Sequence, residues 1–237
     1  MVAAWKIAII ATSHALMGGT GEETGVWLEE LTTPYYALAD KGIDVDIYSI
    51  GGGSVPIDPR SLKPKGGNDA SVERYLGDEK LQRALRETKS IADLNTGKYD
   101  AVFLPGGHGT MWDFPDSARL AEIVSQSLES GRVVGAVCHG PAGLISAKYA
   151  DGTPVVKGKK VAGFTNTEEE AVGLTKTVPF LLEDRLKELG AKYASGPDFE
   201  PFAVRDGLLV TGQNPASAET TVEQMIEALH SLEAAGN

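Results

Sequence analysis

The sequence predicts an α/β fold with a doubly wound, mainly parallel sheet and helices on both of its faces. Short apolar runs rich in β-branched residues alternate along the chain with longer segments whose apolar residues recur at helical spacing. The chain has 237 residues, of which 42% are hydrophobic, so it can bury a large core without metals or disulfides. We therefore expect residues 1–237 to form a single domain of this class.

The first half of the chain is expected to form the first strands and helices of this sheet. Apolar runs predict the strands, whereas leucines at helical spacing and a terminal glycine, as at Gly42, predict the helices. Residues 51–67 shift to Gly and Pro, which indicates a surface excursion rather than a domain linker, because the sheet pattern resumes afterwards. The expected elements are strands at 6–12, 44–50 and 99–104 and helices at 27–41 and 78–94.

The second half continues the same alternation. Apolar residues on one face predict a helix that leads directly into the strand carrying the single cysteine, and glycine again ends a later helix at Gly190. The expected elements are helices at 117–130, 141–149, 180–189 and 217–232, and strands within 132–140 and at 160–164 and 208–211.

Charge and composition limit the partners and the setting. A formal net charge of −11 argues against nucleic acid or an anionic membrane as the main partner. One cysteine excludes an intramolecular disulfide and favours a reducing, cytoplasmic setting. The apolar run at residues 7–10 is too short to span a membrane, and no signal-peptide layout precedes it.

The segment around the cysteine organises the candidate site. It reads R-V-V-G-A-V-C-H-G from Arg132, so an apolar strand delivers Cys138 to a turn directly before His139. Pro141 then begins an expected helix, which gives the strand–turn–helix arrangement that holds a nucleophile above the carboxyl edge of a parallel sheet. The helix N-terminus is expected to lower the thiol pKa from its free value of about 8.5. The alternative is a buried structural cysteine, the commoner role of an isolated one.

Other polar residues are expected at the same edge, because ligands bind at the carboxyl ends of strands in such sheets. These are His14 after the first strand, the loop at 106–109 and the glutamates at 168–170. The glycine-rich stretch at 18–25 does not fit a phosphate loop, since it lacks the Gly-Lys-Ser/Thr ending and contains two glutamates.

A thiolate nucleophile needs a basic partner, donors for an oxyanion and an acid that orients the base. His139 is the expected partner, and its backbone N–H together with that of Gly107 is expected to bind the oxyanion. His108 is expected to contact substrate at the rim or to be plain surface. No metal is expected, because none of the four histidines has ligand spacing. The run Glu168–Glu169–Glu170 offers the acid, although such runs are also typical of the first turn of a helix.

Two motifs relate the chain to a known superfamily. With P-G-G-H-G from Pro105 and A-V-C-H-G-P-A from Ala136, the sequence resembles the PfpI-type, class I glutamine-amidotransferase-like superfamily. Further stretches, T-G-V-W-L-E-E-L-T-T-P from Thr24 and T-G-Q-N-P-A-S-A from Thr211, resemble its branch of glutathione-independent glyoxalase III enzymes, also described as heat-inducible chaperones. The fold that this resemblance implies is flavodoxin-like.

Residue by residue, the resemblance implies Cys138 as the nucleophile and His139 as its partner. The acid that orients the histidine matches Glu169, six residues after Gly163, and a second acid that touches the thiol matches Glu30. Because two anions in contact would repel each other, we expect Glu30 to hold a proton at neutral pH.

The activity that the resemblance implies is conversion of methylglyoxal to D-lactate in defence against carbonyl stress, without glutathione, metal or any other cofactor. Glyoxal is a second expected dicarbonyl substrate, and Met111 and Trp112 are expected to help wall the pocket. Two alternatives stay open: a stress-inducible chaperone or redox-sensing protein, and a cysteine amidase or peptidase of the same fold. The resemblance also implies a homodimer.

Overall fold

A computed structural model describes residues 5–236 of the chain. Its centre is a seven-stranded sheet in the order β3-β2-β1-β4-β5-β9-β8, parallel throughout except between β9 and β8. A separate two-stranded pair joins β6 to β7. The strands are β1 Lys6–Ala11, β2 Asp44–Ser49, β3 Lys89–Ser90, β4 Ala101–Leu104, β5 Val133–Val137, β6 Lys160–Val161, β7 Lys192–Tyr193, β8 Ala203–Asp206 and β9 Leu209–Gly212.

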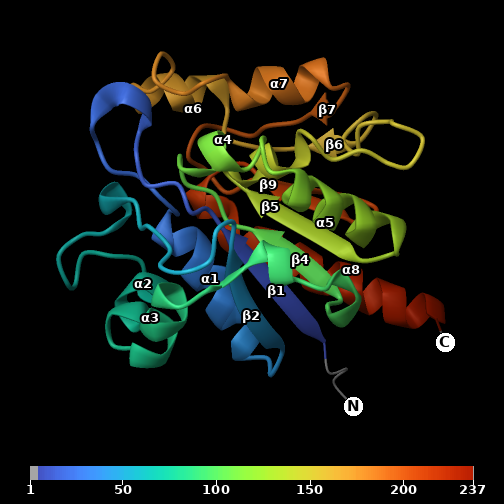
Figure 1. Ribbon diagram of the computed structural model, residues 1–237, viewed down its shortest axis with the longest axis horizontal. Helices are drawn as coiled ribbons and strands as arrows, with labels where there is room; N and C mark the ends of the chain where they lie inside the picture. The colour runs from blue at the N-terminus through green and yellow to red at the C-terminus, as the bar shows by residue number, and fades with distance from the viewer. Residues whose placement is uncertain (1–4, 237) are drawn as a thin grey trace.

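Helices cover both faces of the sheet (Figure 1). α1 and α8 pack together on one face, and α5 packs on the other. The helices are α1 Leu28–Ala39, α2 Ala70–Leu76, α3 Glu79–Arg86, α4 Thr110–Asp113, α5 Ala118–Glu129, α6 Asn166–Ala171, α7 Leu182–Glu188 and α8 Ala218–Gly236. Short 3-10 helices lie at Gly18–Thr20, Pro59–Ser61, Ile91–Asp93, Thr96–Lys98, Gly140–Leu144 and Pro215–Ser217. Within residues 5–236, no helix is both long and apolar enough to cross a membrane.

Strand β1 shows why both faces of the sheet are buried. Ile7 and Ile9 join the core on the side of α1 and α8, whereas Ala8 and Ile10 join the core beneath α5. Successive side chains of a strand point to opposite faces, so a strand covered on both sides must be apolar at every position. This is the physical basis of the continuous apolar run in the sequence.

The observed sheet confirms the predicted fold class, and its long parallel strands follow the flavodoxin-like order β2-β1-β4-β5-β9. Strands β1 and β4 are neighbours, but the chain leaves them toward opposite edges of the sheet. The space beyond their carboxyl ends is therefore the topological switch point, where such sheets bind ligands. The segments after β1, β4 and β5 meet at this edge, close to α4 and α6 (Figure 1).

Several local predictions are wrong. The helix expected at 78–94 ends at Arg86, because Thr88 then exchanges two backbone hydrogen bonds with Gly53 and draws the chain back into the sheet as β3. The strand expected at 160–164 is only two residues long and lies outside the main sheet. The sequence pattern also does not predict α2 or β8, both of which are short and only partly buried.

The segment after the cysteine differs from the prediction in a way that affects the chemistry. In place of an α-helix over 141–149, a 3-10 helix spans Gly140–Leu144, and all five of its residues are buried. Gly140 lies against the Leu104 carbonyl so closely that a side chain would collide with it. A single buried 3-10 turn has a weaker dipole than a long α-helix, so it stabilises a neighbouring anion less.

Candidate active site

Cys138 occupies the sharp turn at the end of β5. Its φ of 60° is left-handed, a conformation that costs energy in a residue other than glycine. Two backbone hydrogen bonds hold it there: its N–H donates to the Gly212 carbonyl at 3.0 Å, and its carbonyl accepts from Phe164 N–H at 2.9 Å. The thiol is 3% exposed, as expected for a nucleophile elbow at the floor of a pocket.

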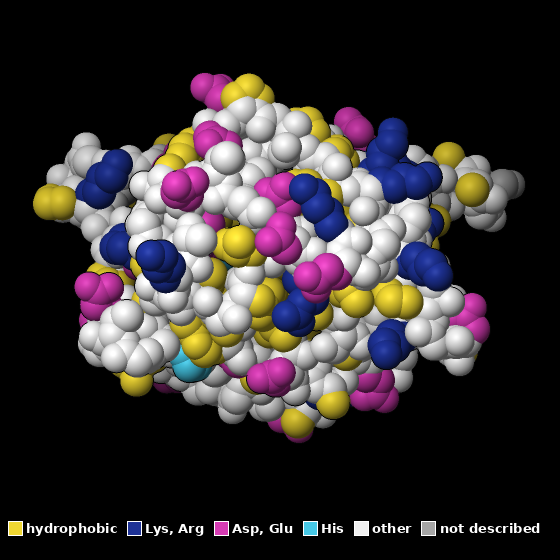
Figure 2. Space-filling model, turned by 90° about the horizontal axis from the view of Figure 1, so that it is seen from above, with side chains coloured by type: hydrophobic (Ala, Val, Ile, Leu, Met, Phe, Trp, Pro, Cys, Tyr) yellow, Lys and Arg dark blue, Asp and Glu magenta, His cyan; other side chains and the backbone are white. Residues whose placement is uncertain are grey.

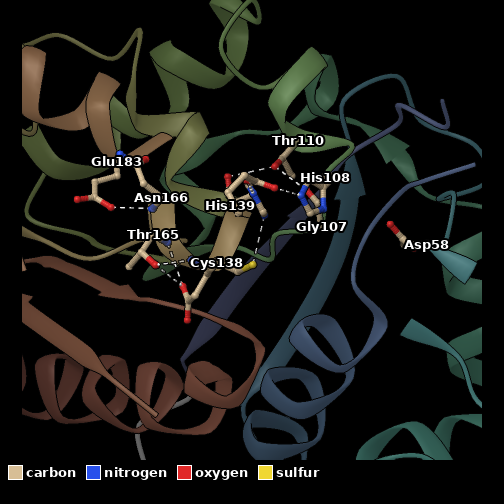
Figure 3. Close-up of polar contacts among 12 residues, drawn as sticks. Asp58, Gly107, His108, Thr110, Cys138, His139, Thr165, Asn166 and Glu183 are labelled. Atoms are coloured by element: carbon tan, nitrogen blue, oxygen red, sulfur yellow. Dashed lines mark hydrogen bonds and ion pairs between the residues drawn. The ribbon is translucent and has the colours of Figure 1, made fainter. Parts of the chain in front are cut away.

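His139 connects the thiol to a carboxylate. Its Nδ1 lies 3.4 Å from Cys138 Sγ, and its Nε2 lies 2.7 Å from Glu169 Oε2. Figure 3 shows the His139 ring above the Cys138 sulfur, with a dashed line joining them. The structure therefore brings together the three side chains that the resemblance predicted as nucleophile, base and orienting acid.

Of the two roles expected for His108, plain surface is wrong, and contact with substrate stays a prediction, since His108 lines the cavity described below. The His108 side chain is 4% exposed, and its Nε2 lies 2.6 Å from Glu169 Oε1. Burial and the nearby His139 lower the pKa of His108 to about 4, against the opposing effect of Glu169. Its ring stays neutral at physiological pH.

Glu169 thus holds one imidazole on each of its two oxygens. Burial acts to raise the pKa of Glu169, but His139 and His108 outweigh it and lower that pKa well below its usual range. The carboxylate stays ionised, as it must to stabilise a positively charged His139.

Glu30 projects from the first turn of α1 and is fully buried. Gly106 N–H donates to its Oε2 at 2.7 Å, and the carboxyl also interacts with the Cys138 thiol. Within residues 5–236, its Oε1 has no hydrogen-bond partner of good geometry. Burial raises the pKa of Glu30 well above its usual range, which favours the protonated acid.

The expectation of a low thiol pKa is wrong. Burial, and next the Glu30 carboxyl, raise the pKa of the Cys138 thiol well above its usual value. The weak 3-10 turn after Cys138 does not compensate for this. Cys138 and Glu30 form a coupled pair that cannot ionise together, so activation of the thiol depends on transfer of its proton.

The backbone N–H groups of Gly107 and His139 stay available for a ligand. Among residues 5–236, neither donates to another backbone or side-chain group. Gly107 has a φ of 102°, and a side chain there would meet the backbone of Gly25, so only glycine fits. The oxyanion site formed by these two N–H groups stays a prediction.

A cavity of about 260 Å³ opens above Cys138. Cys138, His139, His108 and Arg60 contribute polar groups to its wall, and most of the wall is apolar. The lining residues are Trp27, Arg60, Gly107, His108, Cys138, His139, Phe164, Val172, Phe199 and Pro215.

Three residues expected near the chemistry lie outside this cavity wall. Trp112 stacks on His14, with ring centroids 5.3 Å apart, and Met111 packs in the core beneath α5. His14 instead contacts the Leu16 carbonyl at 2.6 Å. The aromatic wall comes from Trp27, on the connection into α1, and from later loops.

The glutamate run has two roles rather than one. Glu169 faces the histidines, whereas Glu168 is fully buried on the other side of α6 and Glu170 is exposed. Glu168 completes a capping box with Thr165. Its Oε1 also accepts from Phe199 N–H at 2.7 Å, Asn214 Nδ2 at 2.8 Å and Gln213 Nε2 at 3.0 Å.

Phe199 is a wall residue that the sequence analysis missed. Its φ of 59° is left-handed and its side chain is 47% exposed at the rim of the cavity. The hydrogen bond from its N–H to Glu168 holds this strained residue in place. Figure 2 shows the molecule from above, with acidic, basic and hydrophobic side chains intermingled on that face.

The folded chain brings together possible metal ligands that are far apart in the sequence. Ligand atoms of His108, His139 and Glu169 lie within 4.8 Å of one another. These three residues have no metal-ligand spacing along the chain, so the cluster cannot be seen in the sequence. In the structure the Nε2 atoms of both histidines face the carboxylate oxygens, so these atoms already hydrogen-bond to one another.

Comparison with known proteins identifies the family. A model of the DJ-1/PfpI family matches residues 23–228. The chain belongs to the DJ-1/PfpI family. The superfamily that the motifs predicted is therefore confirmed.

Relatives within the DJ-1/PfpI family are similar over nearly the whole chain. "Glutathione-independent glyoxalase HSP31" of Saccharomyces cerevisiae is 34% identical, and the match covers 94% of this chain and 98% of the relative. "Glyoxalase 3" of Candida albicans is 35% identical with the same coverage. Among solved structures, Rapid Encystment Protein 24 KDa of Francisella tularensis has a TM-score of 0.91 at 42% identity, covering 95% of this chain and 99% of that one. Glyoxalase III of Candida albicans has a TM-score of 0.87 at 32% identity, covering 95% and 97%.

Glu168→Gln is expected to destabilise this DJ-1/PfpI family member. An amide at this position loses the negative charge that the three donors on Oε1 share with Thr165 N–H on Oε2, and one half of it cannot accept a hydrogen bond. We expect a loss of about 2 kcal/mol or more in the free energy of unfolding and a melting temperature lower by roughly 5 °C. Thermal denaturation of Glu168→Gln beside the exposed control Glu170→Gln measures this. Equal melting temperatures in the two variants would contradict it.

Proposed function

We propose that this protein is a glutathione-independent glyoxalase that converts small 2-oxoaldehydes to 2-hydroxy acids, with methylglyoxal giving D-lactate. One observation carries the proposal: the thiol of Cys138 contacts a histidine on one side and a buried carboxyl on the other, at the floor of a small cavity. This reaction needs a nucleophile, a base for the thiol and a separate acid–base group that moves a proton between adjacent carbons. The names of the relatives from S. cerevisiae and C. albicans support it.

The first step forms a bond between Cys138 Sγ and the aldehyde carbon. His139 Nδ1 is placed to take the thiol proton, and Glu169 on Nε2 stabilises the resulting imidazolium. The aldehyde oxygen becomes the hydroxyl of a hemithioacetal. In this proposal the N–H groups of Gly107 and His139 stabilise negative charge on that oxygen during the attack.

The second step moves hydrogen from the former aldehyde carbon to the neighbouring carbonyl carbon. A base removes the proton from the first carbon while the neighbouring carbonyl oxygen gains a proton, which gives an enediol. The second carbon is then protonated from one side and the hydroxyl on the first carbon loses its proton, which gives a thioester bearing a hydroxyl group. Glu30 suits this transfer because its Oε1 has no partner of good geometry within residues 5–236, and it is held beside the sulfur. A carboxyl whose pKa is raised by burial exchanges a proton near neutral pH more readily than an ordinary one.

Hydrolysis completes the cycle. Water adds to the thioester carbonyl, the carbon–sulfur bond breaks, and the hydroxy acid leaves while the thiol regains a proton. His139 is placed to activate this water because it already contacts the sulfur. The net reaction is addition of one water molecule to the 2-oxoaldehyde, so no oxidant, reductant or glutathione takes part.

The cavity favours this proposal over a peptidase or amidase. A volume of about 260 Å³ with aromatic walls accommodates a small molecule, whereas a peptide needs an open groove with backbone donors along it. The resemblance also motivates the proposals of a homodimer and a cytoplasmic location. A role as a stress chaperone is compatible with the enzyme and is tested separately, by client aggregation with a variant that lacks the thiol.

Cys138→Ser is expected to abolish turnover of methylglyoxal while leaving the melting temperature nearly unchanged. A hydroxyl in this buried site has no accessible anion, so it cannot replace the thiol as a nucleophile. The measurements are D-lactate formation, by a stereospecific assay, and thermal denaturation. Most of the wild-type rate remaining in this variant would exclude the covalent mechanism, and absence of D-lactate with the wild-type protein would exclude the proposed function.

Glu30→Gln is expected to lower kcat by roughly two orders of magnitude or more, the usual loss when a positioned acid–base group is removed. The amide keeps a similar shape but cannot exchange the proton between the two carbons. Glu29→Gln is the matched control, since Glu29 lies next in sequence but lines a different groove with Thr33 and Asp69. Similar losses in both variants would remove Glu30 from the mechanism.

Phe199→Gly is expected to raise KM for methylglyoxal several-fold without lowering the melting temperature. Glycine relieves the left-handed backbone, worth about 1 kcal/mol, and this gain offsets the modest packing energy of a half-exposed side chain. Steady-state kinetics and thermal denaturation test this, with Leu232→Ala as a control at an exposed apolar position on α8. An unchanged KM with a lower melting temperature would show that Phe199 serves stability rather than binding.

A further inference from the structure

A chain of contacts continues from the candidate active site to a buried aspartate that the mechanism does not use. Beyond Glu169 and His108, the next group is Arg60, whose Nη2 lies 3.2 Å from His108 Nδ1. Arg60 in turn pairs with Asp58 through Nε at 3.0 Å and Nη2 at 2.6 Å. Figure 3 shows Asp58 on the opposite side of His108 from Cys138.

Arg60 determines which nitrogen of His108 carries the hydrogen. A guanidinium only donates hydrogen bonds, so His108 Nδ1 must accept from it. The hydrogen of a neutral imidazole then resides on Nε2, the atom that faces Glu169 Oε1. His108 is thereby fixed as a neutral donor to the carboxylate.

Arg60 is itself held rigidly. Asp58 is fully buried, accepts the Thr24 hydroxyl at 2.8 Å and caps the 3-10 helix by accepting Arg60 N–H at 2.9 Å. A paired, two-point contact of this kind fixes the plane of the guanidinium as well as its position. The surface excursion expected at 51–67 therefore delivers a cation to the wall of the cavity.

We propose that Arg60 is a positioning residue that selects which of two histidines becomes charged. Two imidazoles contact one carboxylate, and only the imidazole that also faces the thiol should accept its proton. By occupying His108 Nδ1 with a donor, Arg60 prevents a proton from binding there and reserves the charge of Glu169 for His139. The role of this proton transfer in turnover rests on the glyoxalase proposal. The selection of His139 over His108 as the charged histidine does not depend on it.

The charges around His108 agree with this assignment. Arg60 and Asp58 approach from the 3-10 helix at Pro59–Ser61, Glu169 from α6, and Cys138 and His139 from the turn after β5; Glu30 lies beyond the thiol on α1. Without Arg60, His108 loses a neighbouring positive charge and the donor on Nδ1, so its pKa rises from about 4. Its protonated form then competes with His139 for Glu169 as pH falls.

The test is the pH dependence of thiol reactivity in Arg60→Met. Alkylation of Cys138 by iodoacetamide needs no glyoxalase substrate, so its result stands even if the proposed function fails. We expect the loss of reactivity on acidification to begin roughly one pH unit higher than in the wild type. The nitrogen chemical shifts of His108 in an isotope-labelled protein should change from the Nε2–H tautomer to a mixture, and methylglyoxal turnover should show the same acid shift.

Three variants distinguish positioning from simple bracing of the loop. In Arg60→Met alone, the buried carboxylate of Asp58 is left unpaired and can lower stability. The double variant Asp58→Asn/Arg60→Met removes that carboxylate, and we expect it to keep the acid shift in thiol reactivity even if its stability recovers. Arg60→Lys keeps a donor and should restore part of the wild-type profile. Arg74→Met removes a two-point pair with Asp40 on the surface and should shift nothing. An unchanged His108 tautomer, or a uniform loss of reactivity at all pH values, would overturn the proposal.

Discussion

The carboxylate of Glu169 is the interaction on which the site depends. It lies between two imidazoles, at 2.7 Å from His139 and 2.6 Å from His108, and so joins α6 to the loop after β4 and the turn after β5. A buried carboxylate is stable only when its charge is compensated. The two rings supply that compensation, and the carboxylate fixes their orientation in return. The sheet contributes by ending β4 and β5 side by side in parallel register.

A second buried carboxyl serves the opposite purpose. Among residues 5–236, Glu30 forms no ion pair with a cation, and burial holds a proton on it next to the thiol. Two glutamates within one pocket thus have pKa values displaced in opposite directions, one by histidines and one by desolvation. Separation of this kind is how a protein obtains a permanent anion and a proton donor from the same type of side chain.

The sequence predicts the parts of this protein that depend on local pattern. Strands buried on both faces and the Gly-bounded cysteine turn are visible as apolar runs and turn residues, so the fold class and the position of Cys138 follow from them. The motifs further indicate Glu169 and Glu30, which periodicity alone cannot distinguish from Glu168 and Glu29. What the sequence does not reveal depends on contacts between distant segments: the burial of His108, and the contact that Arg60 makes with it. The Asp-Pro-Arg order is typical of a capped turn, because Asp favours the N-cap and Pro the first turn, but this signal was missed within the expected surface excursion. The same three residues do not indicate that the arginine contacts His108.

The left-handed backbone at Cys138 has a consequence for how such a sequence can change over time. The position is strained with any side chain that has a Cβ, and glycine would relieve the strain. Replacement by glycine would therefore tend to make the protein more stable while removing its thiol. Mutation under a demand for stability alone would drift toward that sequence, so retention of cysteine at this turn requires continuous selection for its chemistry. The left-handed backbone of Cys138 therefore lowers stability at a position where the side chain serves function.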